Sequence, residues 1–161
     1  MNSKILTLDQ LAAESGRLRS QSQRVVATNG CFDILHVGHV RYLAAAQKLG
    51  HVLVVGLNGD DSVRQLKGEG RPVNRERDRA EVLAGLESVD YVTIFPGKRA
   101  TNFLRAVQPA VYAKGGDYTA NTLDPEERAV LDEFGTRIEI IPFEKGYSTS
   151  ELLTRIGPNN G

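Results

Sequence analysis

The 161-residue sequence contains no tryptophan, one cysteine and one methionine, and aromatic residues make up only 6% of it. A single thiol cannot form an internal disulfide, so no disulfide framework stabilises the fold. No apolar run approaches the roughly 20 residues of a membrane-spanning helix. Residues 1–4 lead into a polar segment rather than the apolar core of a signal peptide. We therefore expect a cytoplasmic protein that does not bind a membrane.

The sequence also lacks an excess of charge of either sign. Its 20 lysines and arginines balance its 20 aspartates and glutamates, which gives a formal net charge of zero. No overall positive field exists to draw the chain onto nucleic acid, so any binding of anions must be local. The length suits a single domain with one core, spanning residues 1–161.

Short apolar runs alternate with helical patterns along the chain. The runs predict strands at 24–28, 52–57, 91–95, 111–114 and 137–141. Helices are expected at about 7–20, 38–49, 60–66, 75–88, 101–107, 125–135 and 148–157, with capping residues at Thr7, Asn74, Asp124 and Ser148. The tail, 158–161, is expected to be frayed. This alternation predicts an α/β fold, a Rossmann-like parallel five-stranded sheet with helices on both faces.

The stretch after the first predicted strand, 28–39, reads Thr-Asn-Gly-Cys-Phe-Asp-Ile-Leu-His-Val-Gly-His and holds two of the three histidines. His36 and His39 are three residues apart at a helix N-terminus, so both side chains can point to the same side. Free amides and the helix dipole favour anions there, and Gly38 leaves room for a phosphate to approach the backbone. The stretch predicts a phosphate site.

Two other readings of the histidine pair exist. An isolated pair is often an ordinary feature of a loop or core, without a ligand. Histidines at this spacing can also bind zinc, but the only nearby third ligand is Asp33 and no cluster of cysteine or histidine completes a set. We therefore expect no metal held by protein ligands.

Other unusual residues follow the neighbouring strands. Asn29 and Gly30 end the first strand, and Lys114-Gly115-Gly116-Asp117 ends the fourth. A charged, glycine-containing loop at 67–73 follows the short helix after the second strand. Ligands of parallel sheets bind beyond the carboxyl ends of the strands, so these segments should meet at one edge.

The first predicted strand is followed by Gly30-Cys31-Phe32-Asp33 and then, at a helix start, by His36-Val37-Gly38-His39. This arrangement resembles the signature of the HxGH nucleotidyltransferases, the cytidylyltransferase-like branch of the Rossmann-type enzymes. The similarity runs from about residue 24 to residue 156. Segments 30–36, 66–68, 71–74 with Arg79, 114–118, 143–144 and 148–150 resemble the subgroup of adenylyltransferases acting on D-glycero-β-D-manno-heptose 1-phosphate. Many members are fused to a sugar kinase, and the resemblance implies the free-standing form.

The resemblance implies transfer of AMP from ATP to the heptose 1-phosphate, with release of pyrophosphate, in ADP-heptose and lipopolysaccharide biosynthesis. It implies ATP as co-substrate, Mg²⁺ held mainly by phosphates, and a homo-oligomer, commonly a dimer. The residues it implies are, for catalysis, His36, His39, Lys67 and Arg79; for the nucleotide, Asn29, Gly30, Phe32, Gly38, Gly116, Ser148 and Thr149; and for the sugar phosphate, Asp33, Arg71, Lys114 and Asp117.

Several of these residues also have ordinary explanations. Lys67 resembles any surface lysine, and Arg79 resembles its solvated neighbours Arg75 and Arg77. Ser148 with a glutamate three residues on is explained by helix capping alone, and Asp117 is a common turn residue.

The base and the class of protein also have alternatives. Cytidylyltransferases for glycerol 3-phosphate carry an Arg-Thr pair where this chain has Phe143-Glu144, and an acidic residue associated with cytosine where it has Gly116. These departures favour adenine. The alternatives are a cytidylyltransferase for a small phosphorylated alcohol and a non-catalytic nucleotide-binding module on the same fold.

Overall fold

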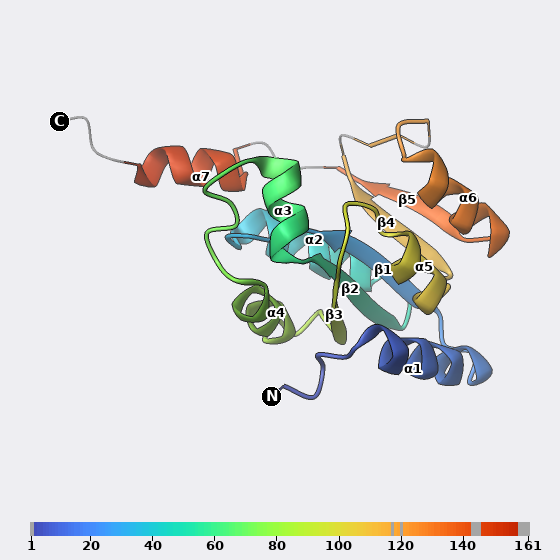
Figure 1. The fold of residues 1–161 in the computed structure, drawn as a ribbon. Coiled ribbons are helices and arrows are strands. Elements are labelled where there is room, and N and C mark those ends of the chain that lie inside the picture. Colours follow the sequence, from blue (N-terminus) through green and yellow to red (C-terminus); the bar gives the residue numbers. More distant parts are fainter. Residues whose placement is uncertain (1, 117, 120, 143–145, 158–161) are drawn as a thin grey trace.

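The computed structural model describes residues 2–116, 118–119, 121–142 and 146–157. Five strands form one sheet in the order β3-β2-β1-β4-β5, and each neighbouring pair is parallel (Figure 1). The strands are β1 Val25–Gly30, β2 Val52–Asn58, β3 Tyr91–Phe95, β4 Val111–Gly115 and β5 Arg137–Ile141. This arrangement confirms the predicted fold class.

Helices cover both faces of the sheet. They are α1 Leu8–Ser20, α2 Val37–Gln47, α3 Asp60–Lys67, α4 Glu76–Ala84, α5 Thr101–Val107, α6 Pro125–Glu133 and α7 Thr149–Ile156. Helices α1, α5 and α6 pack together on one face, whereas α2 and α4 contact the strands on the other. Helix α7 extends away from the sheet, and none of its residues is buried (Figure 1). Among the described helices, none has the length and apolar character needed to span a membrane.

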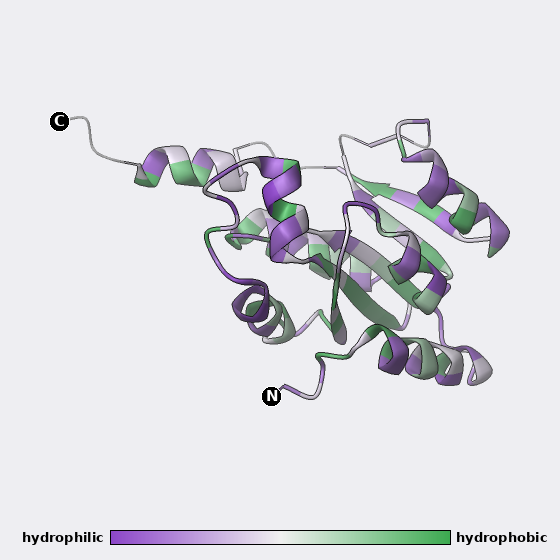
Figure 2. Ribbon diagram, in the orientation of Figure 1, coloured by the Kyte–Doolittle hydropathy of each residue, from purple (hydrophilic) through white to green (hydrophobic). Residues whose placement is uncertain are grey.

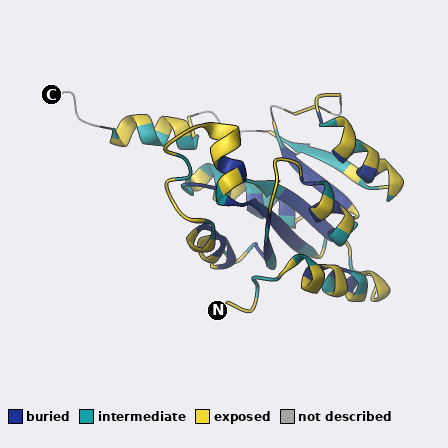
Figure 3. Ribbon diagram, viewed as in Figure 1, coloured by how far each residue is buried: buried dark blue, intermediate teal, exposed yellow. Residues whose placement is uncertain are grey.

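The central strands are apolar because both of their faces are covered. The first four residues of β1 and the last six of β2 are buried, which explains why they read as continuous runs rather than as alternating patterns (Figures 2 and 3). Tyr112 and Phe103 belong to the core under α1, α5 and α6. Leu43 and Leu83 belong to the core under α2 and α4.

Local capping signals set most helix starts. Thr7 and Gln10 form both halves of the expected capping box. The carboxylate of Asp124 accepts hydrogen bonds from two amides of the first turn of α6. The prediction that Asn74 caps α4 is wrong, because the residue at the cap is Arg75 and the Asn74 side chain donates instead to the Asp33 carbonyl oxygen.

The sheet order reverses direction at β1. From β1 the chain crosses to β2 and β3 on one side, and later returns to place β4 and β5 on the other. In open parallel sheets, ligands bind at this point, beyond the carboxyl ends of the strands. The carboxyl ends of β1 and β4 are neighbours, and α2 begins seven residues after β1 ends. Asn29, Gly30, Lys114 and the start of α2, which carries the histidines, therefore lie at this edge.

Candidate functional site

The two histidines are held at the N-terminus of α2 by the backbone. The amide of Gly38 donates to Nδ1 of His36 at 3.1 Å, and the amide of His36 donates to Nδ1 of His39 at 3.3 Å. Because Nδ1 accepts in both rings, each neutral imidazole carries its proton on Nε2. The rings stack with their centroids 3.9 Å apart, so they present two Nε2–H donors together.

Both rings are neutral at pH 7. Burial, together with a smaller effect of the neighbouring His36, lowers the pKa of His39 to about 4. Burial also lowers the pKa of His36, against an opposing effect of the Glu151 carboxylate. The Phe32 ring packs edge-on against the His39 ring, with the ring centroids 5.4 Å apart. The backbone of Phe32 has a positive φ of 44°. The pair is therefore a partly buried, uncharged set of donors suited to phosphate oxygens.

Gly38 is required for a reason different from the one we predicted. A Cβ atom at this position would lie 2.9 Å from the His36 ring and 2.9 Å from Cβ of Tyr147. The space beside Gly38 is thus filled by the protein, and the glycine allows the segment before α7 to pack on the start of α2.

Asp33 anchors the loop that precedes α4. Its buried carboxylate accepts hydrogen bonds from the amides of Val73 and Asn74, and from Nε of Arg71 at 2.8 Å. Burial raises the pKa of Asp33, but the Asn74 and Val73 amides and the Arg71 guanidinium together hold it below its ordinary value. In the structure these two predicted sugar-phosphate residues, Asp33 and Arg71, are therefore paired with each other.

Arg79 lies in the interior rather than on a ligand surface, which corrects the expectation that it approaches the phosphates. Its side chain is 0% exposed. Four of its N–H groups donate to protein acceptors, the carbonyl oxygens of Cys31, Asn58 and Asn74 and the carboxylate of Asp60. Arg79 therefore ties together the ends of β1 and β2, the start of α3 and the loop held by Asp33.

Lys67 is the last residue of α3 and is exposed. Gly68 and Gly70, which follow it, have positive φ and nothing within 4 Å of an added Cβ. Burial raises the pKa of the Cys31 thiol, and the charge of Lys67 is among those that oppose this rise. Lys67 thus lies near the carboxyl end of β1, on an open segment bounded by α3 and by the Asp33-anchored loop.

Lys114 forms a second cationic position, at the end of β4. Its Nζ donates to Oδ1 of Asn29 at 3.4 Å and lies 5.2 Å from the Tyr112 ring and 4.7 Å from the Tyr118 ring. Sequence reasoning missed Tyr112 and included Tyr118 only as part of the segment 114–118 that carries the resemblance. The signal for Tyr112 was present, because residues two apart in a strand share a face of the sheet.

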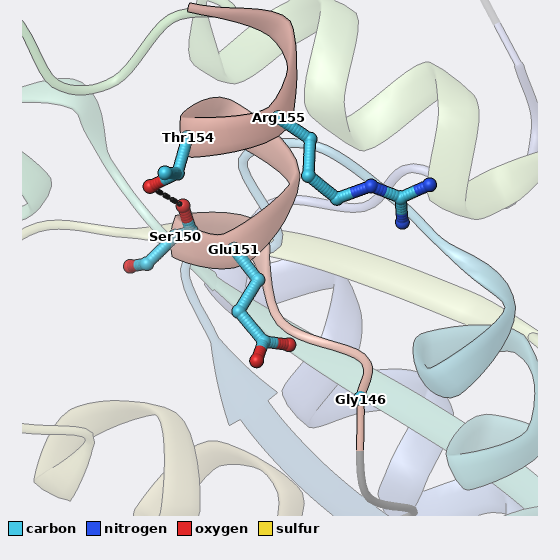
Figure 4. Close-up of a pocket in the computed structure, with 5 residues that line it drawn as sticks. All are labelled: Gly146, Ser150, Glu151, Thr154 and Arg155. Carbon is cyan, nitrogen blue, oxygen red and sulfur yellow. Dashed lines mark hydrogen bonds between the residues drawn. The ribbon is translucent and has the colours of Figure 1, made fainter.

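The start of α7 lies beside His36. Ser148 accepts a hydrogen bond from the Glu151 amide, and the Thr149 hydroxyl donates to the Ile34 carbonyl oxygen at 3.2 Å. A hollow of about 430 Å³ lies beside the helix, lined by Gly146, Ser150, Glu151, Thr154 and Arg155, and Figure 4 shows the Arg155 side chain extended from the helix. A narrow adjoining pocket also includes His36, Tyr147 and Ser148. Arg155 lines both spaces and was not predicted.

The other predicted residues lie near these groups or outside the described part. Asn29 and Gly30 end β1 and are half-buried, and Gly116, directly after β4, is exposed. Asp117, Phe143 and Glu144 lie outside the described residues. Within the described residues, no group of three histidine, cysteine, aspartate or glutamate side chains is arranged to hold a metal ion.

Comparison with known proteins gives one family. The family model described as Cytidylyltransferase-like matches residues 27–155. The chain is 44% identical over 155 residues to the "Bifunctional protein HldE" of Geobacter sulfurreducens and 46% identical over 155 residues to that of Citrifermentans bemidjiense. Each alignment covers 96% of this chain and 31% of the relative, so the chain spans about a third of the length of these proteins.

Two solved structures have the same fold. A lipopolysaccharide core biosynthesis protein from Thermoplasma volcanium matches with a TM-score of 0.63 and 28% identity, over 78% of this chain and 99% of that one. A pantoate-beta-alanine ligase from Francisella tularensis matches with a TM-score of 0.60 over 88% of this chain and 67% of that one. At 14% identity, the second match shows the fold alone.

Proposed function

The chain belongs to the cytidylyltransferase-like family of nucleotidyltransferases, and from this premise we propose that it transfers AMP from ATP to D-glycero-β-D-manno-heptose 1-phosphate. A phosphate oxygen of the sugar phosphate attacks the α-phosphorus of ATP in line. The bond from the α-phosphorus to the bridging oxygen breaks, and pyrophosphate leaves with the electron pair. The products are ADP-heptose and pyrophosphate.

The observation that carries the proposal is the paired Nε2–H donors of His36 and His39. Phosphoryl-transfer chemistry needs no protein nucleophile, only alignment of two anions and stabilisation of charge on the phosphate oxygens. Neutral rings fixed by backbone amides supply such donors without reorganisation during the reaction. The N-terminus of α7, adjacent to His36, adds a helix dipole of the right sign for the same phosphates.

Two cations complete the proposed site from opposite sides. Lys67, on its open segment, can close over the triphosphate, and Lys114 binds the phosphate of the acceptor. As the resemblance implies, Mg²⁺ would be held mainly by the phosphate oxygens of ATP and would neutralise charge there. Asp33 and Arg79 act indirectly, by positioning the loop between α3 and α4.

The assignment of heptose 1-phosphate and of the adenine base is based on the resemblance of four segments to the heptose 1-phosphate subgroup, namely 30–36, 66–68, 71–74 and 114–118. The solved relative from Thermoplasma volcanium is described as a lipopolysaccharide core biosynthesis protein, which is consistent with that substrate class. On the same basis we propose that the enzyme works as a homo-oligomer in the cytoplasm.

The test is release of pyrophosphate from ATP or CTP, with Mg²⁺ and either the heptose 1-phosphate or glycerol 3-phosphate. We expect turnover with ATP and the heptose 1-phosphate, with ADP-heptose identified by mass spectrometry. Turnover with CTP and glycerol 3-phosphate instead would refute the substrate assignment.

His39→Ala should lower kcat about a hundredfold or more, the loss typical of removing one preorganised donor. Exposed His51→Ala, directly before β2 and so at the opposite end of the strands from the site, is the matched control and should retain the parent rate.

A further inference from the structure

The ends of β1 and β4 present a group of polar side chains on one face of the sheet. Ala27 pairs with Tyr112 in the parallel ladder, and Asn29 and Lys114 each lie two residues further along. Because alternate residues of a strand share a face, Asn29, Tyr112 and Lys114 are side by side. The face is that of α5 and α6, opposite to the one on which α2 carries the histidines.

One oxygen atom joins the three side chains. Oδ1 of Asn29 accepts a hydrogen bond from the Tyr112 hydroxyl and another from Nζ of Lys114 at 3.4 Å. An ammonium group only donates, so the atom facing it must be the amide oxygen and not the nitrogen. The orientation of the Asn29 amide is therefore fixed, with its oxygen rather than its NH₂ group facing Tyr112 and Lys114. No described residue accepts a hydrogen bond from that NH₂ group.

Lys114 is a buried cation for which the described part of the chain supplies no paired carboxylate. The residue is 8% exposed, and within the described residues it forms no ion pair. Burial lowers the pKa of Lys114, and the Glu127 carboxylate opposes this effect only at a distance. The Tyr112 ring lies on its buried side and the exposed Tyr118 ring also flanks the ammonium. A buried charge without a counter-ion is costly, so the position favours binding of an anion from outside.

We propose that Tyr112 is a positioning residue for the acceptor phosphate. By holding Oδ1 of Asn29, its hydroxyl directs the Asn29 NH₂ group toward the open edge of the sheet, beside the ammonium of Lys114. The two groups then donate together to one phosphate. This inference rests on the proposed function, because it assigns the acceptor half of the same site.

The hydroxyl of Tyr112 is suited to this role because it remains a donor at every working pH. Burial holds the pKa of Tyr112 well above its ordinary value, and the negative charge of Glu127 acts in the same direction. Its ring is 0% exposed, so the hydroxyl cannot turn to solvent. Phenylalanine at 112 would keep the ring and its packing and would remove only the bond to Asn29.

The experiment compares Tyr112→Phe with the parent in steady-state assays of pyrophosphate release, varying each substrate at saturating levels of the other. We expect the KM for the sugar phosphate to rise about tenfold, the usual effect of losing one such hydrogen bond, and the KM for ATP to stay within about twofold. Tyr91→Phe is the matched control. It removes a hydroxyl that donates to Glu14 on α1, far from the site, and should change neither KM.

Asn29→Asp separates positioning from stability. A carboxylate still accepts from Tyr112 and Lys114, so the fold is retained, but it replaces the NH₂ donor with an oxygen that repels phosphate. We expect this variant to raise the acceptor KM more than Tyr112→Phe does, with an unfolding midpoint close to that of the parent. Equal KM values for the acceptor in parent, Tyr112→Phe and Asn29→Asp would overturn the inference, as would an equal rise of both KM values.

Failure of the proposed function would be recognised separately, because the parent would then release no pyrophosphate with the sugar phosphate. In that case, titration calorimetry with inorganic phosphate tests the positioning alone. Binding about tenfold weaker to Tyr112→Phe than to the parent supports it. Equal binding overturns it.

Discussion

Arg79 gives the sharpest test of how the site is held together. In Arg79→Lys the charge is kept, but four hydrogen bonds to four separate acceptors are replaced by at most three from one nitrogen. At least one acceptor among Cys31 O, Asn58 O, Asn74 O and Asp60 loses its donor in the interior.

The magnitude follows from these contacts. Each buried acceptor left without a partner costs about 1–3 kcal/mol, and the shorter ammonium geometry weakens the remaining bonds. We expect a loss of about 3 kcal/mol in the free energy of unfolding. For a chain of this length, about 2–4 °C per kcal/mol gives a fall of roughly 6–12 °C in Tm.

The assay is thermal and urea unfolding followed by circular dichroism, together with the pyrophosphate-release rate. Arg77→Lys, at an exposed position of the same helix, is the matched control and should unfold like the parent. If Arg79→Lys unfolded within about 0.5 kcal/mol of the parent while turnover fell a hundredfold, the reasoning from burial would be refuted. Arg79 would then act on the phosphates directly.

Two further predictions concern His39 and Asp33. An NMR titration of the His39 ring should give a midpoint at about pH 4. In the unfolded chain the ring takes up its proton near pH 6.5, so the contribution of His39 to the free energy of unfolding is fully present above that pH and is lost as the pH falls toward 4. A measured midpoint near 6.5 would contradict the burial argument. Asp33→Asn should speed hydrogen exchange at the Val73 and Asn74 amides about tenfold or more, because one acceptor oxygen is lost, whereas exposed Asp61→Asn should not. Unchanged exchange in Asp33→Asn would show that the loop is held without this carboxylate.

The local signals in the sequence were sufficient for the elements of the fold. The predicted strand at 91–95 is β3, and the predicted strand at 137–141 is β5, at the same residues. The hydrophobic periodicity gave the wrong end for α4. It predicted a helix reaching residue 88, whereas the helix ends at Ala84 with Gly85 as its C-cap. Glycine at the end of a helical pattern was the signal that could have shown this.

The sequence by itself determined that two histidines stand at a helix start after the first strand, because that placement depends on spacing, capping and hydrophobic periodicity over a few residues. Only the tertiary structure decided what the charged residues around them contact. Arg79 bonds to Cys31, 48 residues away, and Asp33 bonds to Asn74, 41 residues away. The direction of the Asn29 amide depends on Lys114, 85 residues away. Such partners lie beyond the reach of any local pattern, so their roles could be assigned only once the sheet had brought the strand ends together.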